Sequence, residues 1–248
     1  MTRWGVIVFP GSNDDHDALW AIGEVLGQEA VPLWHKDADL KNVDAVIVPG
    51  GFSYGDYLRC GAMARFSPVM NSVREFADAG GFVVGICNGF QILCEAGLLP
   101  GALVRNRSLQ FICEIARVRV ENAATAFTRR CRSGELLEIP IKHGEGCYFA
   151  DEATLAEMNR RGQVLFRYAN AAGEVDTASN PNGALDSIAG VSNTRGNVFG
   201  MMPHPEHAVD AAVGGTDGRK LFASLIDQLE ARSVTPRPIA VRAAASRS

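Results

Sequence analysis

The sequence predicts an α/β protein with a doubly wound, mostly parallel sheet and a small antiparallel addition. Short apolar runs rich in β-branched residues alternate with helical patterns in the first part of the chain, which is typical of a parallel sheet covered by helices on both faces. From about residue 102 to 169, strand-like segments instead follow one another with little helix between them. We interpret this second region as the antiparallel addition.

Four apolar runs in the first part are the expected parallel strands, at 4–9, 30–34, 45–48 and 81–86. Helices are expected between them. The first covers 14–27, with acidic residues in its first turn, where they suit the helix dipole. The second has Ser67 at its N-cap and Pro68 at its first helical position, and the third covers 88–96.

The addition and the C-terminal part complete the expected fold, with strands at 102–105, 111–120, 136–141, 164–169, 187–191 and 198–202 and helices at 153–161 and about 218–230. No repeat or linker interrupts residues 1–232, so we expect a single domain there. Residues 233–248 carry three arginines, two prolines and no acid. This composition predicts a flexible tail, with a basic partner-docking arm as the alternative.

The composition excludes several classes of function. The 24 basic and 28 acidic residues give a net charge of −4, which argues against a nucleic-acid-binding surface built on general basicity. No apolar stretch reaches the roughly 18 residues that a membrane span needs, and acidic residues follow the first apolar run too soon for a secretory signal. We therefore expect a cytoplasmic protein without nucleic-acid or membrane partners.

One of the six cysteines is a candidate nucleophile. The cysteines form no C-x-x-C pair, so we expect neither a metal site nor a disulfide framework, and most should be small buried hydrophobes. Cys87 differs because it stands between Gly85 and Gly89 where an expected strand meets a helix. A nucleophile on such a tight turn needs small neighbours, and the helix N-terminus favours its thiolate form. A buried structural cysteine is the alternative.

A candidate base follows the strand at 198–202, in the sequence Pro203-His204-Pro205-Glu206. A cysteine nucleophile needs a base, and the base needs a third group that holds its tautomer and orientation. Residues at i and i+2 of an extended segment face the same way, so Glu206 can reach the His204 ring, and the two prolines favour the extended geometry. Alone, such a pair is more often a surface salt bridge, but the nucleophile motif favours the catalytic interpretation.

The third motif is the glycine-rich loop 49–56, which follows the strand at 45–48. In α/β sheets, ligands bind beyond the carboxyl ends of the strands. Paired glycines there allow backbone N–H groups to approach a ligand closely, and the N–H of Asn88 points to the place where an oxyanion would form next to Cys87. A plain glycine turn is the alternative, although it does not account for the Phe-Ser-Tyr sequence inside the loop.

Five ordered motifs, spread over residues 3–230, resemble the class I glutamine amidotransferases and, within them, the small glutaminase subunits of phosphoribosylformylglycinamidine synthase. They are VPGGFSYGDYLRCGA (48–62), GICNGFQIL (85–93), LVRNRSLQF (103–111), HGEG (143–146) and GMMPHPEH (200–207). Many other class I members have Leu-Gly-His after the nucleophile, where this chain has Asn88-Gly89-Phe90. Residues beyond about 232 have no counterpart in the pattern.

The resemblance implies a flavodoxin-like sheet and a Cys87–His204–Glu206 triad that hydrolyses glutamine through a thioester. It further implies that the oxyanion is held by backbone N–H groups of Asn88 and of Gly51 or Phe52. The resemblance also assigns a glutamine contact to Gln91, and candidates for the pocket rim are Asn106, Ser108 and His143. We expect the remaining histidines, which are His16, His35 and His207, to be structural or surface residues.

The resemblance also implies partners. Ammonia is nearly all ammonium at neutral pH, so the product is useful only if a partner receives it away from water. This chain has no Walker-type phosphate loop, and we expect no cofactor in it. ATP and Mg²⁺ would bind a large ATP-dependent synthetase subunit, bridged by a small third subunit, that converts formylglycinamide ribonucleotide to formylglycinamidine ribonucleotide.

Three other functions remain open at this point. The chain could serve a synthetase of another pathway, with the same triad. A flavodoxin-like redox sensor or chaperone would share a cysteine on the turn but would not require His204 and Glu206. A binding-only subunit with a vestigial site is the third alternative, although the complete triad speaks against it.

Overall fold

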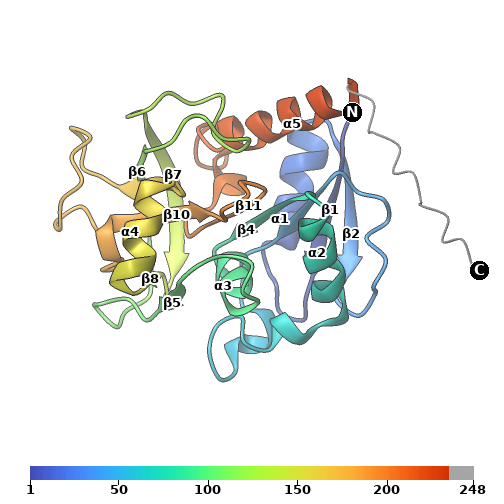
Figure 1. Cartoon of the computed structure of the whole chain (residues 1–248), viewed down its shortest axis with the longest axis horizontal. Coiled ribbons are helices and arrows are strands. Elements are labelled where there is room, and N and C mark those ends of the chain that lie inside the picture. Colours follow the sequence, from blue (N-terminus) through green and yellow to red (C-terminus); the bar gives the residue numbers. More distant parts are fainter. Residues whose placement is uncertain (235–248) are drawn as a thin grey trace, which may run out of the picture.

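A nine-stranded mixed sheet forms the centre of the computed structural model, which describes residues 1–234 (Figure 1). Its strands lie in the order β2-β1-β3-β4-β11-β10-β9-β6-β7, and β5 and β8 pair separately. The strands are β1 (Arg3–Val8), β2 (Glu29–Trp34), β3 (Ala45–Val48), β4 (Phe82–Ile86), β5 (Ala102–Val104), β6 (Ile112–Val120), β7 (Leu136–His143), β8 (Cys147–Phe149), β9 (Val164–Tyr168), β10 (Ile188–Ser192) and β11 (Val198–Met201).

Four of the five α-helices in residues 1–234 cover both faces of the parallel part of this sheet, and α4 (Glu152–Arg160) lies beside the antiparallel part. The four are α1 (Asp15–Trp20), α2 (Pro68–Asp78), α3 (Asn88–Glu95) and α5 (Arg219–Val234), and shorter turns lie at η1 (Ala21–Val25), η2 (Ser53–Asp56), η3 (Ala64–Phe66), η4 (Leu185–Ser187) and η5 (Pro205–Ala208). In Figure 1, α2 and α3 lie on one side of the parallel strands, and α1 and α5 lie on the other. This arrangement confirms the predicted doubly wound sheet.

The predicted division of the sheet is also confirmed. The pairs β1–β2, β1–β3, β3–β4 and β4–β11 are parallel, whereas β10, β9, β6 and β7 pair antiparallel along one side. Because β1, β3, β4 and β11 run in the same direction, the loops that follow them meet at one edge of the sheet. The candidate nucleophile, base and glycine-rich loop all belong to this edge.

Close packing of α3 against the sheet determines where that edge presents its loops. Gly89, in the first turn of α3, lies so near β3 that a Cβ atom there would overlap the carbonyl oxygen of Val48. A Cβ at Gly85, on β4, would lie 2.8 Å from the backbone of Gly89. The glycines of the motif therefore let the helix begin directly on the sheet surface.

Three elements differ from the predicted pattern. The strand expected at 102–105 does not join the main sheet but pairs with β8, whose three residues are too few to give a periodic signal. The helix expected at 14–27 forms over Asp15–Val25, two residues before Gly27 with its positive φ, and its second half, η1, is wound as a π-helix. Ser67 does precede α2, yet its hydroxyl bonds the Tyr54 hydroxyl at 2.9 Å instead of capping the helix.

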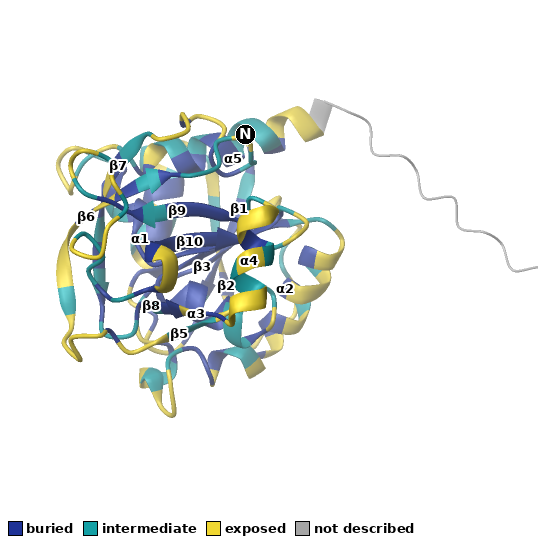
Figure 2. Cartoon of the chain, turned by 60° about the vertical axis from the view of Figure 1, so that its left-hand side comes forward, coloured by how far each residue is buried: buried dark blue, intermediate teal, exposed yellow. Residues whose placement is uncertain are grey.

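The burial pattern places the core along the middle of the sheet. In Figure 2, β9 and β10 are buried, and the exposed residues of α4 face outward. No helix within 1–234 combines the length and apolar character that crossing a membrane would need. The single domain 1–232 stays a prediction. Of the predicted tail, residues 233–234 continue the backbone of α5, and 235–248 lie outside the described residues.

Candidate active site

Cys87 stands on a strained turn between β4 and α3. Its backbone angles, φ 50° and ψ −106°, lie in a region that residues with a side chain rarely adopt and that costs about 1–3 kcal/mol. A hydrogen bond from its N–H to the carbonyl oxygen of Met201, at 2.8 Å, ties this turn to β11. Cys87 is 5% exposed, and its sulfur lies 3.7 Å from the carbonyl oxygen of Lys142. The turn thus presents the sulfur toward the end of β7.

His204 and Glu206 form a buried dyad beyond the end of β11. Nδ1 of His204 lies 2.6 Å from Oε1 of Glu206, and both side chains are buried. The N–H of His204 also donates to the carbonyl oxygen of Pro140 on β7 at 2.8 Å, which fixes the backbone that carries the ring. The geometry excludes the surface salt bridge considered above, and it leaves Nε2 as the ring atom available to a nucleophile.

Cys87 and His204 meet because their strands are neighbours in register. Ile86 pairs with Met201, so the residues that follow β4 and β11 emerge side by side at the sheet edge. Burial alone lowers the pKa of His204, but the negative charge of Glu206, the adjacent Cys87 and the hydrogen bond to Glu206 raise it to about 10. Within residues 1–234, Nε2 has no hydrogen-bond partner. The site therefore favours the protonated, imidazolium form of His204.

The chain matches the family described as the CobB/CobQ-like glutamine amidotransferase domain over residues 2–216. It belongs to this family. Subunits named phosphoribosylformylglycinamidine synthase subunit PurQ are 57% identical over 228 residues in Moorella thermoacetica and over 227 in Salinibacter ruber, each alignment covering 92% of this chain and 97% of the relative.

Solved structures agree with this assignment. The structure of PurLQS from Thermotoga maritima includes a chain that is 43% identical and superposes with a TM-score of 0.81, covering 92% of this amidotransferase and all of that chain. The CTPS glutaminase domain of Trypanosoma brucei, with bound acivicin, has a TM-score of 0.58 at 10% identity and covers 92% of this chain and 94% of that one. At that identity the likeness shows the fold alone.

The glycine-rich loop of the amidotransferase adopts a conformation suited to an oxyanion hole. Gly51 has φ 113°, and a Cβ there would collide with the backbone of Asn13. The Phe52 N–H is engaged with the carbonyl oxygen of Gly11 at 3.1 Å, whereas the N–H groups of Gly51 and Asn88 donate no hydrogen bond to residues 1–234. This difference favours Gly51 over Phe52 as the second donor, with Asn88 as the first. The assignment stays a prediction.

Asn88 also holds the loop in place through its side chain. Its Oδ1 accepts from the N–H of Ser53 at 3.2 Å, and its Nδ2 donates to Asp56 at 3.2 Å and to Gln91 at 2.9 Å. Gln91 in turn donates to the carbonyl oxygen of Glu145 at 2.6 Å. One network thus connects the glycine-rich loop, α3 and the segment after β7.

A pocket opens beside Cys87, and it gathers several of the predicted residues. Its walls are Asn13, Asp14, Gly51, Phe52, Asp56, Cys60, Cys87, Gln91, Phe111, Lys142, His143, Gly144 and Glu145. Gln91 and His143 therefore lie where contact with a substrate is possible. Burial and the charge of His204 lower the pKa of His143 to about 4, so this second histidine is neutral near pH 7.

The other two rim candidates lie elsewhere. Asn106 is fully buried behind the pocket, where its side chain binds the carbonyl oxygen of His143 at 2.8 Å and the N–H of Gly146 at 2.9 Å. This placement suits support of the pocket wall. Ser108 is exposed, and its hydroxyl accepts from the N–H of Gln110 at 3.3 Å. It is not among the residues that line the pocket, and its role stays a prediction.

The remaining histidines differ in setting. His35 is buried against the Tyr54 hydroxyl at 2.6 Å, and His16 is exposed. His207 packs beside His204, with ring centroids 5.2 Å apart, and its Nε2 lies 3.3 Å from Asp17. These positions fit structural or surface roles, although His207 borders the dyad more closely than the sequence suggests.

Sequence reasoning missed two charged residues of the site, Asp14 and Lys142. Asp14 resembles an ordinary acidic residue at a helix start, and Lys142 has no local motif. Only its position along the chain could have indicated that Asp14 belongs to the site. It follows β1 at the same sheet edge as the loops after β3, β4 and β11. Lys142 lies near the end of β7, whose carbonyl groups already contact the nucleophile and the base.

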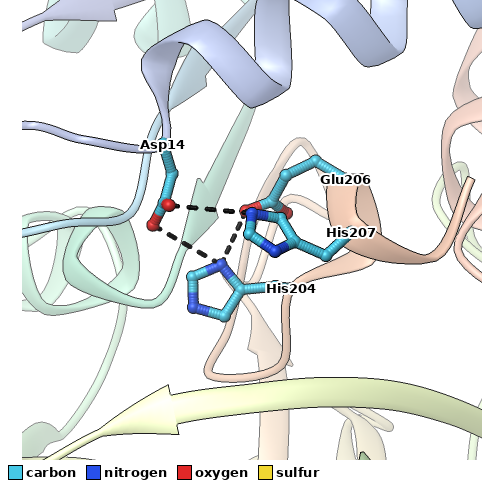
Figure 3. Close-up of side chains that lie close together, drawn as sticks. All are labelled: Asp14, His204, Glu206 and His207. Carbon is cyan, nitrogen blue, oxygen red and sulfur yellow. Dashed lines mark hydrogen bonds and ion pairs between the residues drawn. The ribbon is translucent and has the colours of Figure 1, made fainter. Parts of the chain in front are cut away.

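Asp14, His204, Glu206 and His207 have the donor types of a metal site, with one ligand atom from each within 4.8 Å of the others (Figure 3). The 2.6 Å separation of Nδ1 and Oε1 is a hydrogen bond, shorter than two ligands of one zinc ion allow. Lys142 also lies 2.5 Å from Asp14 and would repel a cation. The arrangement fits a hydrogen-bonded base better than a metal centre.

Proposed function

We propose that this amidotransferase is the glutaminase subunit of a phosphoribosylformylglycinamidine synthase. The observation that carries the proposal is the strained Cys87 turn beside the buried His204–Glu206 dyad, in a chain 57% identical to subunits named PurQ over 92% of its length. A redox or chaperone protein would not need the buried dyad.

The chemistry begins with attack of the Cys87 thiolate on the side-chain amide carbon of glutamine. The oxyanion that forms is held by the N–H groups of Gly51 and Asn88, an interaction worth about 10²–10³ in rate per donor. His204, as imidazolium, gives its Nε2 proton to the departing nitrogen, which leaves as ammonia. The glutamyl group remains bound to the sulfur as a γ-glutamyl thioester. Neutral His204 then takes a proton from water, whose oxygen attacks the thioester and releases glutamate.

The other residues orient these reacting groups. Glu206 holds the proton on Nδ1 and stabilises the positive charge that His204 carries. Gln91 and His143 line the pocket and would contact the substrate glutamine. Each glutamine and one water thus give one glutamate and one ammonia.

Ammonia then passes to a partner. We place ATP and Mg²⁺ on a large synthetase subunit, joined by a small bridging subunit, with no cofactor in this chain. The PurLQS structure, in which a 43% identical chain occurs, supports such partners. The six cysteines are free thiols, which suits the reducing cytoplasm, where we place the reaction.

Reconstitution with the synthetase tests this function. With glutamine as the nitrogen source, Cys87→Ser should abolish formylglycinamidine ribonucleotide formation, whereas with ammonium chloride the variant complex should remain active. Cys113→Ser, at an exposed cysteine, should behave as the wild type in both assays. Glutamine-dependent synthesis by the Cys87→Ser complex, or none by the wild type, would refute the proposal.

A further inference from the structure

Asp14 is a buried carboxylate that does not perform the usual task of its position. It occupies the N-cap of α1, where an aspartate normally accepts a hydrogen bond from the first turn, but its side chain makes no such bond. Instead it is 2% exposed and points into the active site. Burying a carboxylate is costly unless charged partners compensate, so its partners indicate what it does.

Those partners are the base and a lysine from another strand. Oδ2 of Asp14 lies 3.7 Å from Nδ1 of His204, and Oδ1 lies 2.5 Å from Nζ of Lys142 and 3.6 Å from Nε2 of His207. Figure 3 shows Asp14 and Glu206 both directed toward Nδ1 of His204, each from its own side. Oδ2 has no hydrogen-bond partner within 1–234, so this oxygen acts on the imidazole through its charge.

We propose that Asp14 is a positioning residue, a second carboxylate that stabilises the imidazolium form of His204, and that Lys142 limits the strength of this stabilisation. The inference rests on the proposed glutaminase function. Glu206 already accepts the Nδ1 proton, so Asp14 adds electrostatic support without replacing it. Lys142 keeps Asp14 ionised and offsets part of its charge, which prevents the base from holding its proton too tightly to release it to ammonia.

The pKa of Asp14 agrees with the roles proposed for Asp14 and Lys142. Burial raises the pKa of Asp14, but the polar contact with His207 at 3.6 Å and the charges of His204 and Lys142 lower it well below its usual range. Asp14 is therefore ionised wherever the enzyme is active. The titratable or charged groups around His204 are Cys87 before α3, Glu206 and His207 in η5, Asp14 before α1, and Lys142 and His143 at the end of β7.

Two substitutions that remove charges of opposite sign distinguish an electrostatic role of Asp14 from a merely structural one. Asp14→Asn keeps the shape and removes a negative charge, so His204 should lose its proton at lower pH. Lys142→Met removes a positive charge, so His204 should keep its proton to higher pH. A merely structural role would impair both variants without moving their pH profiles in opposite directions.

The experiment measures glutaminase kcat/KM from about pH 6 to about pH 11.5, beyond the His204 pKa of about 10, with the full chain in its synthetase complex. The alkaline limb is the fall of kcat/KM at high pH, where His204 loses its proton. Because Asp14 lies 3.7 Å from Nδ1 of His204 and its charge is partly screened, this limb should move down by about one pH unit in Asp14→Asn. In Lys142→Met it should move up by a smaller amount. Asp17→Asn, at a half-exposed carboxylate 3.3 Å from His207, is the matched control and should leave the limb in place.

Each outcome decides the inference. An unchanged alkaline limb in Asp14→Asn, or shifts of the same sign in both variants, overturns it, and if Asp14→Asn does not fold, the direction of the Lys142→Met shift decides. The pH dependence of iodoacetamide alkylation at Cys87, followed on its peptide, gives the same shifts without glutamine binding. Absence of glutaminase activity in the wild type would instead contradict the proposed function, which keeps the two failures distinct.

Discussion

At the residue scale, two histidines at one site show how environment assigns protonation. His204 and His143 are both buried, and burial lowers the pKa of each. His204 has the Glu206 carboxylate and Cys87 as neighbours, which reverse this effect and raise its pKa to about 10. His143 instead faces the positive charge of His204, and its pKa falls to about 4. One ring can therefore supply a proton while the other remains neutral.

Acid should destabilise the protein through His143. Because its pKa is lowered from 6.5 to about 4, the unfolded chain binds this proton more readily than the folded protein. The free energy of unfolding should thus be unaffected by this group above pH 6.5 and fall by about 3 kcal/mol as the pH drops to 4.

Urea unfolding between pH 4 and 8 measures this effect. His143→Gln should lose less stability than the wild type across that range, whereas His16→Gln, at an exposed position, should follow the wild type. Parallel pH profiles for the wild type and His143→Gln would contradict this account of His143.

At the element scale, the contact between α3 and the sheet sets the position of the nucleophile. Gly89→Ala should force the first turn of α3 away from Val48, since the added Cβ would overlap its carbonyl oxygen. We expect a loss of about 2 kcal/mol or more in the free energy of unfolding, with a lower kcat because Cys87 moves with the helix.

Gly23→Ala is the matched control for this substitution. Its Cβ would meet only the Cβ of Ala30 at 3.8 Å, within a helical segment, so it should be neutral or stabilise by up to about 1 kcal/mol. Denaturant unfolding and glutaminase kinetics of both variants test the prediction. Equal stability of Gly89→Ala and the wild type would mean that the close approach of α3 is not required.

The elements also show what the sequence can and cannot predict. Parallel strands were predictable because fully buried strands give continuous apolar runs. The placement of Cys87, His204 and Glu206 at one sheet edge was predictable because they occupy characteristic turns, and their catalytic roles stay predictions. The β5–β8 pair was not, since three-residue strands carry no period. Asp14 was missed because its role depends on Lys142, which is distant in sequence and adjacent only in the folded chain.

At the scale of the whole molecule, the two segments that bring Phe52 and Phe111 to the pocket carry a set of exposed apolar side chains, which we call the apolar rim. Phe52, Tyr57, Leu58, Leu109 and Phe111 are all exposed, and the rings of Phe52 and Phe111 stack with centroids 6.4 Å apart. Phe52 and Phe111 also line the pocket beside Cys87. Such a rim is typical of an interaction surface, and its place suits a partner that must receive ammonia without exposing it to water.

Leu58→Asp should therefore weaken the complex with the synthetase. Leu58 is 88% exposed, so the substitution should not affect folding, but it places a charge where the partner would bury an apolar side chain. We expect glutamine-dependent synthesis to fall at least about tenfold at limiting subunit concentration, in line with the loss of an interface contact. Trp20→Glu, which changes an exposed side chain of α1, should leave both binding and synthesis unchanged. If the Leu58→Asp chain bound the synthetase with wild-type affinity, the apolar rim would not be part of the interface.

The central claim is that sulfur of one cysteine takes the glutamyl group while its neighbouring histidine supplies the proton for ammonia. Rapid quenching of the full chain with glutamine and the synthetase, followed by peptide mass spectrometry, tests it most directly. We predict a transient γ-glutamyl adduct confined to the peptide that contains Cys87, absent in Cys87→Ser and accumulating less in His204→Asn. Turnover of glutamine without any adduct, or an adduct on another cysteine, would contradict the account.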